Sequence, residues 1–218
     1  MNKIAGIVIA IIIVIAGGLL ILNFNSSTVD DNSMMGGESD PTEKLPTDAQ
    51  FTLDAESSTL TWSASRIVGE SHTGTVDIAR GRVVRQDGEF IGGEFVFDMN
   101  TISESKDNQI FLKDVKSDDF FGVEQFPTAD LVITSIVPAS DSSFAVTGEL
   151  TIRGITNEIS FTADTSFSKG ILLAEANFEI NRTRWGIVFD SGTFFANLGD
   201  EAIKDEIQYE LDLVFTQN

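Results

Sequence analysis

From residue 51 onward the chain alternates between apolar and polar residues, and this pattern limits the folds open to it. The clearest run lies near the C-terminus, where Ile207, Tyr209 and Leu211 alternate with Gln208 and Glu210. Successive side chains of a strand point to opposite faces of a sheet, so such a run buries one face and exposes the other. This pattern is typical of antiparallel sheets and not of βαβ units, whose strands are apolar throughout.

The same alternation recurs in five earlier segments, namely residues 60–64, 91–99, 144–152, 155–167 and 172–180. Turn residues separate them, for example the Asp87-Gly88 pair, which is a strong hairpin signal. In the second segment we expect Ile91, Phe95 and Phe97 to share the buried face. About eight short strands result, and such a set closes into a barrel or folds as a sandwich. Glycines inside the strands, such as Gly92-Gly93, indicate bent strands of a barrel wall.

Two segments do not follow the strand period. In residues 105–118 the apolar residues Ile110, Phe111 and Val115 have helical spacing, which predicts a short helix capping one end of the barrel. Residues 190–200 are irregular and contain Phe194 and Phe195. We expect this stretch to close either the same end or the other one.

An apolar run at the N-terminus predicts a membrane anchor. Residues 4–22 are 19 residues without a charge, long enough to span a bilayer core of about 30 Å. Lys3 precedes the run and Asp30-Asp31 follow it, which predicts a cytoplasmic N-terminus. The alternative is a cleaved signal peptide, but its apolar region would be shorter and end in an A-x-A-like site.

The chain is therefore predicted to have a transmembrane anchor at residues 1–23, an acidic flexible linker at 24–49 and one β domain at 50–218. This organisation predicts a single-pass protein of the cytoplasmic membrane, with its C-terminal domain on the periplasmic or extracellular side. The net charge of −20 argues against binding to nucleic acid. The absence of cysteine excludes disulfides and a lipoprotein anchor.

Three motifs follow one another along this region, namely DDFFGVEQFPTA at residues 118–129, TGELTIRGIT at 147–156 and NRTRWGI at 181–187. In this order they resemble the motifs of the YceI-like family. SHTGT at residues 71–75 is also similar to the opening strands of one branch of that family. The likeness extends from about residue 50 to 217 and so covers the whole predicted β domain.

The resemblance implies an all-β, lipocalin-like antiparallel barrel of about eight strands, with one or two short helices and an apolar interior. It also implies an exported, non-catalytic protein that binds or transports a long-chain amphiphilic lipid, such as an isoprenoid or an isoprenoid quinone. The predicted helical anchor and acidic linker depart from common members, which argues against a freely diffusing shuttle. The alternative is a non-catalytic structural or interaction module with a filled core, displayed on the membrane.

The candidate ligand contacts are the residues expected to face the barrel interior, together with one arginine of the third motif. They are Trp62, Phe95, Phe97, Leu131, Ile133, Val146, Phe161, Phe178, Leu211 and Leu213, and Arg182. A dry, filled core would need the same apolar inward faces, so alternation alone leaves both readings open. Arg182 could meet a polar head group at the barrel mouth, or it could be a solvent-facing strand residue paired with an acid.

The sequence offers no catalytic or metal site. His72 is the only histidine, no nucleophile motif accompanies it, and a hydrogen-bonded structural histidine is the simpler reading. We therefore expect no enzyme activity and no cofactor other than a bound isoprenoid lipid or quinone. The expected partners are a hydrophobic small molecule and, through the N-terminal helix, the membrane. Phe120, Phe121 and Phe126 are expected either to plug the barrel end or to gate ligand entry.

Overall fold

The computed structural model describes residues 44–218. The predicted membrane span at residues 4–22, and most of the predicted linker, lie outside the described residues. Within residues 44–218, no helix has both the length and the apolar character needed to cross a bilayer.

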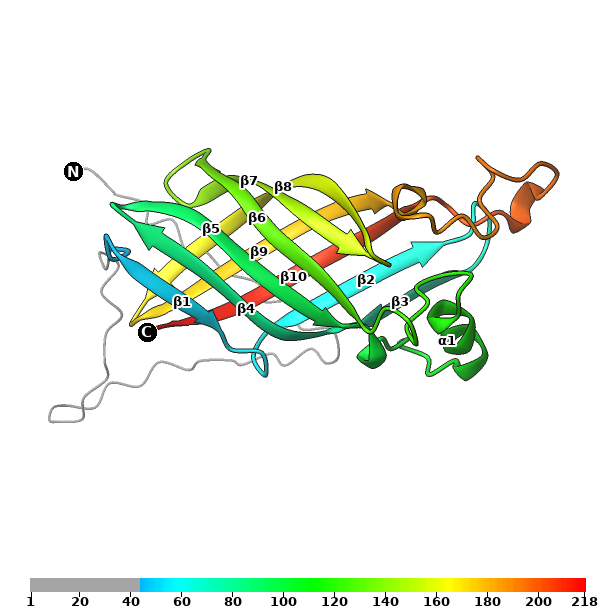
Figure 1. Cartoon of the computed structure of the whole chain (residues 1–218), viewed down its shortest axis with the longest axis horizontal. Coiled ribbons are helices and arrows are strands. Elements are labelled where there is room, and N and C mark those ends of the chain that lie inside the picture. The colour runs from blue at the N-terminus through cyan, green and yellow to red at the C-terminus, as the bar shows by residue number, and fades with distance from the viewer. Residues whose placement is uncertain (1–43) are drawn as a thin grey trace, which may run out of the picture. The chain divides into compact units, whose positions relative to one another are not determined.

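The described chain forms one antiparallel sheet that closes on itself (Figure 1). Its strands are β1 (Ala49–Leu53), β2 (Thr59–Ser65), β3 (Ser71–Thr75), β4 (Asp77–Gln86), β5 (Glu89–Asp98), β6 (Thr128–Pro138), β7 (Ser143–Ile152), β8 (Ile155–Ser168), β9 (Ile171–Asn181) and β10 (Glu206–Gln217). The sequential strands β4 to β10 pair in order, and β1 joins β4 to β10. The predicted barrel is thereby confirmed, with eight strands in the closed ring.

The remaining two strands, β2 and β3, extend the wall at one end. β1 and β2 lie end to end along β10, since Phe51 pairs with Gln217 whereas Trp62 pairs with Tyr209. β3 pairs with β2 and leaves an open edge. The segment after β5 covers that edge: the Ser103 N–H donates to the Thr75 carbonyl at 2.9 Å. Covering the edge prevents pairing with another chain.

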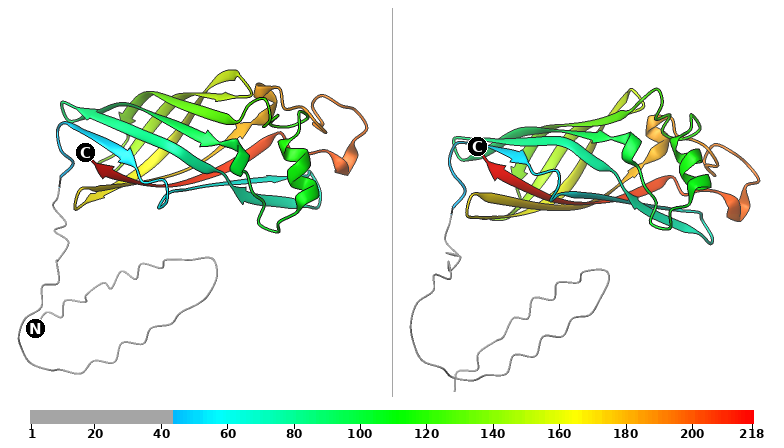
Figure 2. Two further views of the ribbon diagram at one scale, coloured as in Figure 1. Left: turned by 60° about the horizontal axis from the view of Figure 1, so that its bottom comes forward. Right: turned by 90° about the horizontal axis from the view of Figure 1, so that it is seen from below.

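A helix follows that segment, as the sequence predicts for residues 105–118. Helix α1 spans Gln109–Lys116, and the Asn108 side chain caps it by accepting from the Phe111 N–H at 3.1 Å. Three short 3₁₀ helices complete the fold: η1 (Met99–Thr101), η2 (Arg182–Trp185) and η3 (Gly199–Glu201). The views in Figures 1 and 2 place α1 and the η2–η3 segment at the same end of the barrel.

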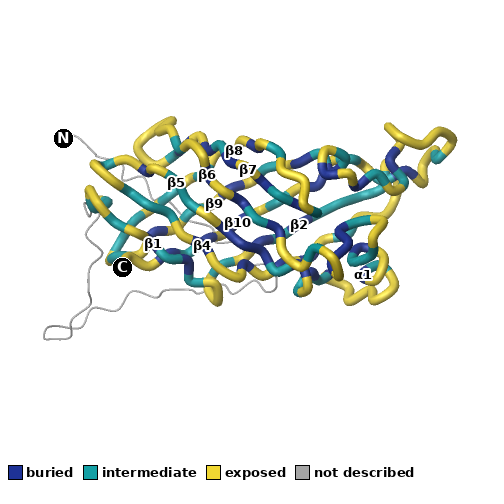
Figure 3. Tube along the Cα trace, in the orientation of Figure 1, coloured by how far each residue is buried: buried dark blue, intermediate teal, exposed yellow. Residues whose placement is uncertain are grey.

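The inward rows form one buried core, drawn in dark blue in Figure 3, with Phe51 and Phe215 almost fully enclosed. One expected row is wrong at its start. Ile91 is 55% exposed and Phe90 is buried instead. The β4–β5 register shifts between Val84 and Arg85, and this bulge inverts the facing of residues before Gly92. The Gly-Gly pair thus marks a bulge as well as a bend.

Gly74 on β3 lets the barrel end close. A Cβ at this position would overlap the Ser103 carbonyl oxygen and lie 2.9 Å from Cζ2 of Trp62. Only a residue without a side chain therefore allows both the covering segment and the Trp62 ring to pack against β3.

Replacing Gly74 with alanine should lower the free energy of unfolding of the full chain by about 1–3 kcal/mol, because backbone must shift. Urea unfolding measures this difference. Gly192→Ala is the matched control, since its Cβ would make only ordinary contact at 3.5 Å with Ala202. Equal stabilities for the two variants would contradict the packing argument.

Candidate functional site: a cavity inside the barrel

The barrel contains a cavity of about 380 Å³ at the end where α1 lies. Its wall includes Ile110 and Phe189, which are 79% and 40% exposed, so the cavity reaches the surface there. Ligand pockets typically have volumes from about 300 Å³ upward. The barrel interior is therefore hollow at this end, and the expectation of a filled core does not hold for it.

A second cavity of about 80 Å³ lies deeper in the barrel. Phe97, Leu131 and Leu211 line both cavities, so the two are neighbours along the barrel axis. The wall of the smaller cavity is almost entirely aliphatic and aromatic. A chain-like apolar ligand that enters the larger cavity would thus meet further apolar surface ahead of it.

The sequence-predicted residues all line one cavity or the other. The larger cavity alone is lined by Trp62, Phe178 and Arg182. Both cavities share Phe97, Leu131 and Leu211. The smaller cavity alone is lined by Phe95, Ile133, Val146, Phe161 and Leu213. The fold therefore brings these residues together on the inside of the barrel, and their role as ligand contacts stays a prediction.

An aromatic ladder runs along the wall from one cavity to the other. The rings of Phe161 and Phe178 stack with centroids 4.7 Å apart, and those of Phe178 and Tyr209 with centroids 5.6 Å apart. Tyr209 belongs to the C-terminal alternating row, so its inward position follows from the sequence, although it is absent from the predicted contacts. The ladder gives the wall a rigid face that suits a flat or unsaturated chain.

A second aromatic stack joins α1 to the barrel wall. The Phe111 ring of α1 stacks on two rings of the wall, with its centroid 3.8 Å from that of His72 and 6.1 Å from that of Trp62. All three residues line the larger cavity. Sequence reasoning missed Phe111 and His72 as cavity residues, because no local pattern shows which strand α1 covers.

A buried carboxylate holds this stack in place. The Glu104 side chain is fully enclosed and accepts hydrogen bonds from the Lys106 and Asn108 N–H groups, while Oε1 lies 3.3 Å from His72 Nδ1. Burial alone would raise the pKa of Glu104, but the bonds from Asn108, His72 and Lys106 outweigh it and lower that pKa. A lowered folded-state pKa means that the ionised carboxylate stabilises the fold above the ordinary glutamate pKa. This contribution is lost as the pH falls through the folded-state value.

The expectation that His72 is a hydrogen-bonded structural residue agrees with these contacts. Its ring is held between Glu104 and Phe111, and Nε2 lies 3.8 Å from a Glu70 carboxylate oxygen. These contacts hold His72 in place as part of the cavity wall.

Two neutral donors belong to the apolar wall. Trp62 Nε1 is buried and has no hydrogen-bond partner among residues 44–218, a state that costs about 1–3 kcal/mol. Tyr209 pairs directly with Trp62 across β10 and β2, so both side chains lie on the inner face. Burial raises the pKa of the Tyr209 phenol, which therefore stays protonated and able to donate.

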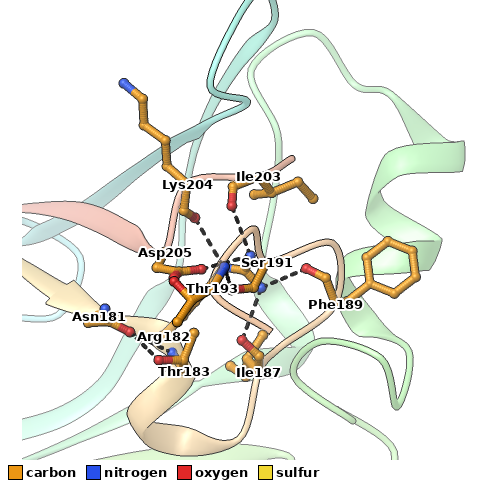
Figure 4. A network of polar contacts seen from close by, with 10 residues as sticks. All are labelled: Asn181, Arg182, Thr183, Ile187, Phe189, Ser191, Thr193, Ile203, Lys204 and Asp205. Atoms are coloured by element: carbon orange, nitrogen blue, oxygen red, sulfur yellow. Dashed lines mark hydrogen bonds and ion pairs between the residues drawn. The ribbon is translucent and has the colours of Figure 1, made fainter. Parts of the chain in front are cut away.

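Arg182 has a different environment from the one expected. It begins the 3₁₀ helix η2, is 1% exposed and is enclosed by the segment that follows it (Figure 4). Its guanidinium donates to the carbonyl oxygens of Lys204, Ile187, Phe189 and Ile203 at 2.9–3.1 Å, and to Asp205 Oδ1 at 3.4 Å. The alternative of a solvent-facing strand residue is wrong.

These contacts use all five N–H donors of Arg182, so a ligand could bind the group only by breaking a protein bond. Burial lowers the pKa of Arg182, and the charges of Asp205 and Asp190 oppose that shift. Arg182 thus holds the segment 187–205 in place through hydrogen bonds to its carbonyl oxygens. Trp185 is fully buried beside it and donates from Nε1 to the Leu150 carbonyl at 3.0 Å, so it packs under the barrel end.

The three phenylalanines of the first motif divide into two groups. Phe120 and Phe121 line the larger cavity, and Phe120 packs against Phe189 with centroids 5.3 Å apart. Phe126 instead lies over Gly122 and Gly154, outside the cavity. Phe120 and Phe121 form part of the wall near the opening and do not fill it.

Replacing Arg182 with lysine should reduce the free energy of unfolding by about 2–5 kcal/mol, because an ammonium cannot reach five diverging acceptors. The matched control is Arg184→Lys, since Arg184 is exposed and donates to the single Glu158 carbonyl. Chemical unfolding of both full-length variants measures the difference. A loss for Arg182→Lys no larger than that of the control would show that the network does not hold this end together.

Comparison with known proteins gives relatives at the level of sequence. A UPF0312 protein of Staphylococcus aureus strain USA300 is 30% identical over 128 residues, which is 54% of this chain and 66% of that protein. A UPF0312 protein of Shewanella denitrificans is 30% identical over 73 residues, or 34% of this chain and 38% of its own length. The matched region thus spans less than two thirds of these relatives.

Solved structures share the fold. BcnA of Burkholderia cenocepacia superposes with a TM-score of 0.63 at 18% identity and covers 74% of this chain and 98% of its own. A polyisoprenoid-binding domain from Saccharophagus degradans, implicated in plant cell wall breakdown, gives a TM-score of 0.60 at 13% identity, covering 77% and 98%. The YceI-like domain family matches residues 51–215, nearly all of the described barrel. The chain therefore belongs to the YceI-like family.

Proposed function

We propose that this protein binds a long-chain isoprenoid lipid or isoprenoid quinone inside the barrel, at the outer face of the membrane. The observation that carries the proposal is the apolar cavity of about 380 Å³, which reaches the surface at one end and has a second apolar cavity beyond it. Each buried CH₂-sized group of a prenyl chain gains about 0.8 kcal/mol in such surroundings. The polyisoprenoid-binding domain of Saccharophagus degradans, which shares the fold, supports this class of ligand.

The donors in the wall favour an uncharged head group. Trp62 Nε1 has no hydrogen-bond partner within the described part of the chain, and Tyr209 is a neutral phenol. A carbonyl or hydroxyl oxygen beside them would therefore gain a hydrogen bond. The cationic Arg182 has its donors occupied by the protein. A quinone or polyprenol head that enters the cavity therefore suits this part of the wall better than a phosphate does.

The same proposal assigns the first 23 residues to a single-pass anchor, because residues 4–22 form an uncharged apolar run. An anchored barrel stays next to the membrane that supplies its ligand. The barrel would bind the lipid and release it again near the same membrane, with no enzymatic step. An interaction module without a ligand is the competing function, and an empty, unresponsive cavity would favour it.

The proposal can be tested by filling the cavity from one wall position. Ala129 on β6 is buried and lines the larger cavity, so Ala129→Phe places a ring in the ligand's space. The full chain in membrane vesicles would be exposed to a photoactivatable geranylgeraniol analogue. Crosslinked peptides would then be identified by mass spectrometry. We expect crosslinks on inward residues of the barrel, reduced about tenfold by Ala129→Phe, equivalent to about 1.4 kcal/mol.

The matched control is Ala145→Phe, because Ala145 on β7 is exposed on the outer face. It should leave crosslinking unchanged. Crosslinks confined to outer-face peptides, or equal labelling of both variants, would contradict binding inside the barrel.

A further inference from the structure

The cavity end of the barrel carries large exposed hydrophobic side chains on its loops and on α1. We call them the tip cluster; each is 40–79% exposed, and they are Ile67, Val68, Ile110, Phe189, Phe194 and Phe195. Other exposed large hydrophobics lie on the outer faces of strands, such as Val132 on β6 and Leu173 on β9. Connecting loops are normally polar, so three exposed phenylalanines in the segment 186–205 are unusual.

A main-chain hydrogen bond and a ring contact join the segments that carry the tip cluster. The Ile67 N–H donates to the Ala202 carbonyl at 2.8 Å, which joins the β2–β3 turn to the segment 186–205. The Phe120–Phe189 contact joins that segment to the chain after α1. Figures 1 and 2 show these segments at the same end of the barrel, and Figure 3 draws most of their residues as exposed.

The tip cluster also borders the cavity opening. Ile110 and Phe189 belong both to the cluster and to the cavity wall. Whatever covers the cluster therefore faces the entrance of the cavity. A ligand could pass between the two without crossing water.

Charge is unevenly distributed between the tip and the rest of the domain. The tip segments 66–70, 105–117 and 186–205 carry seven acids and five bases, whereas the remainder of residues 51–218 carries 21 acids and seven bases. An acidic surface is repelled by anionic lipid head groups. The nearly balanced tip is the part of the domain that approaches a membrane at least electrostatic cost.

We propose that the tip cluster is a bilayer-contact site, which inserts its apolar side chains at the membrane surface and opens the cavity toward the lipid. This inference rests on the proposed function, because a cavity that opens toward a bilayer is useful only if its ligand is a membrane lipid. The bilayer is favoured as occupant by the uncharged apolar run at residues 4–22 of the same chain and by the charge distribution of the tip. Large exposed apolar patches on soluble domains mark membrane or protein interaction sites.

The length of the chain permits this orientation. The 22 residues from 23 to 44 reach at most roughly 70 Å when extended. The longest strand, β8 with 14 residues, is about 46 Å long. The barrel can therefore turn its tip to the membrane although Ala49 enters the sheet near the β4–β5 turn, away from α1.

The chain has no cysteine, so single cysteines can be introduced without background labelling. Spin labels would be attached to Val68→Cys and Phe194→Cys at the tip. Asp141→Cys, on the exposed turn between β6 and β7, is the control at the other end. The full chain would be reconstituted in phosphatidylcholine vesicles, and label collisions with oxygen and with a water-soluble nickel complex would be measured.

We expect the tip labels to collide more with oxygen than with nickel and the Asp141→Cys label to stay aqueous. Adding Phe194→Ser to the Val68→Cys protein should withdraw that label toward water. Equal nickel accessibility at all three positions would overturn the proposal, as would concentration-dependent spin coupling between tip labels, which would identify a second copy as the occupant.

The measurement needs no isoprenoid in the cavity. Immersed tip labels in vesicles of phosphatidylcholine alone would uphold the contact site even if geranylgeraniol crosslinking failed. Aqueous tip labels beside successful crosslinking would overturn only the contact site.

Discussion

Closure of the sheet through β1 and β10 is the constraint on which the rest of the structure depends. Once the ring is closed, every second side chain of eight strands points to one axis, and no edge of the ring remains to be paired. A ring of that size can be filled by side chains or can hold one small ligand. In this barrel the side chains fill the β1 end more fully than the α1 end, where the larger cavity lies.

The open end needs a different kind of stabilisation, because the loops there cannot pack into the space the cavity occupies. Two buried charged groups supply it. Arg182 donates hydrogen bonds to carbonyl oxygens of the segment 187–205. Glu104 accepts hydrogen bonds from the N–H groups ahead of α1 and also contacts His72. Each charge is satisfied by several hydrogen bonds, as burial requires. The rim is thus ordered by polar contacts and leaves its apolar side chains facing outward.

The strands, their inward rows and α1 could be predicted because each depends on local periodicity. The family likeness, borne out over residues 51–215, also predicted the barrel topology, whereas the class of ligand that it implies stays a prediction. The facing of Ile91 could not be predicted, because a bulge changes the period at a point that only cross-strand pairing reveals. The surroundings of Arg182 and the Phe111–His72 contact could not be predicted either. Each contact joins residues more than 20 positions apart in the sequence, and the segment around Arg182 has no regular period. Cavity volume is likewise a property of the packed rows together and is not encoded in any one of them.

Native mass spectrometry combined with lipid extraction would show whether the barrel holds an isoprenoid lipid. The full-length protein would be purified from the membranes of an expressing host. We expect a near-stoichiometric isoprenoid or isoprenoid quinone to co-purify with the chain. A protein that is empty on isolation and takes up no added polyprenol or quinone would contradict this expectation, and would favour an interaction module whose cavity has another purpose.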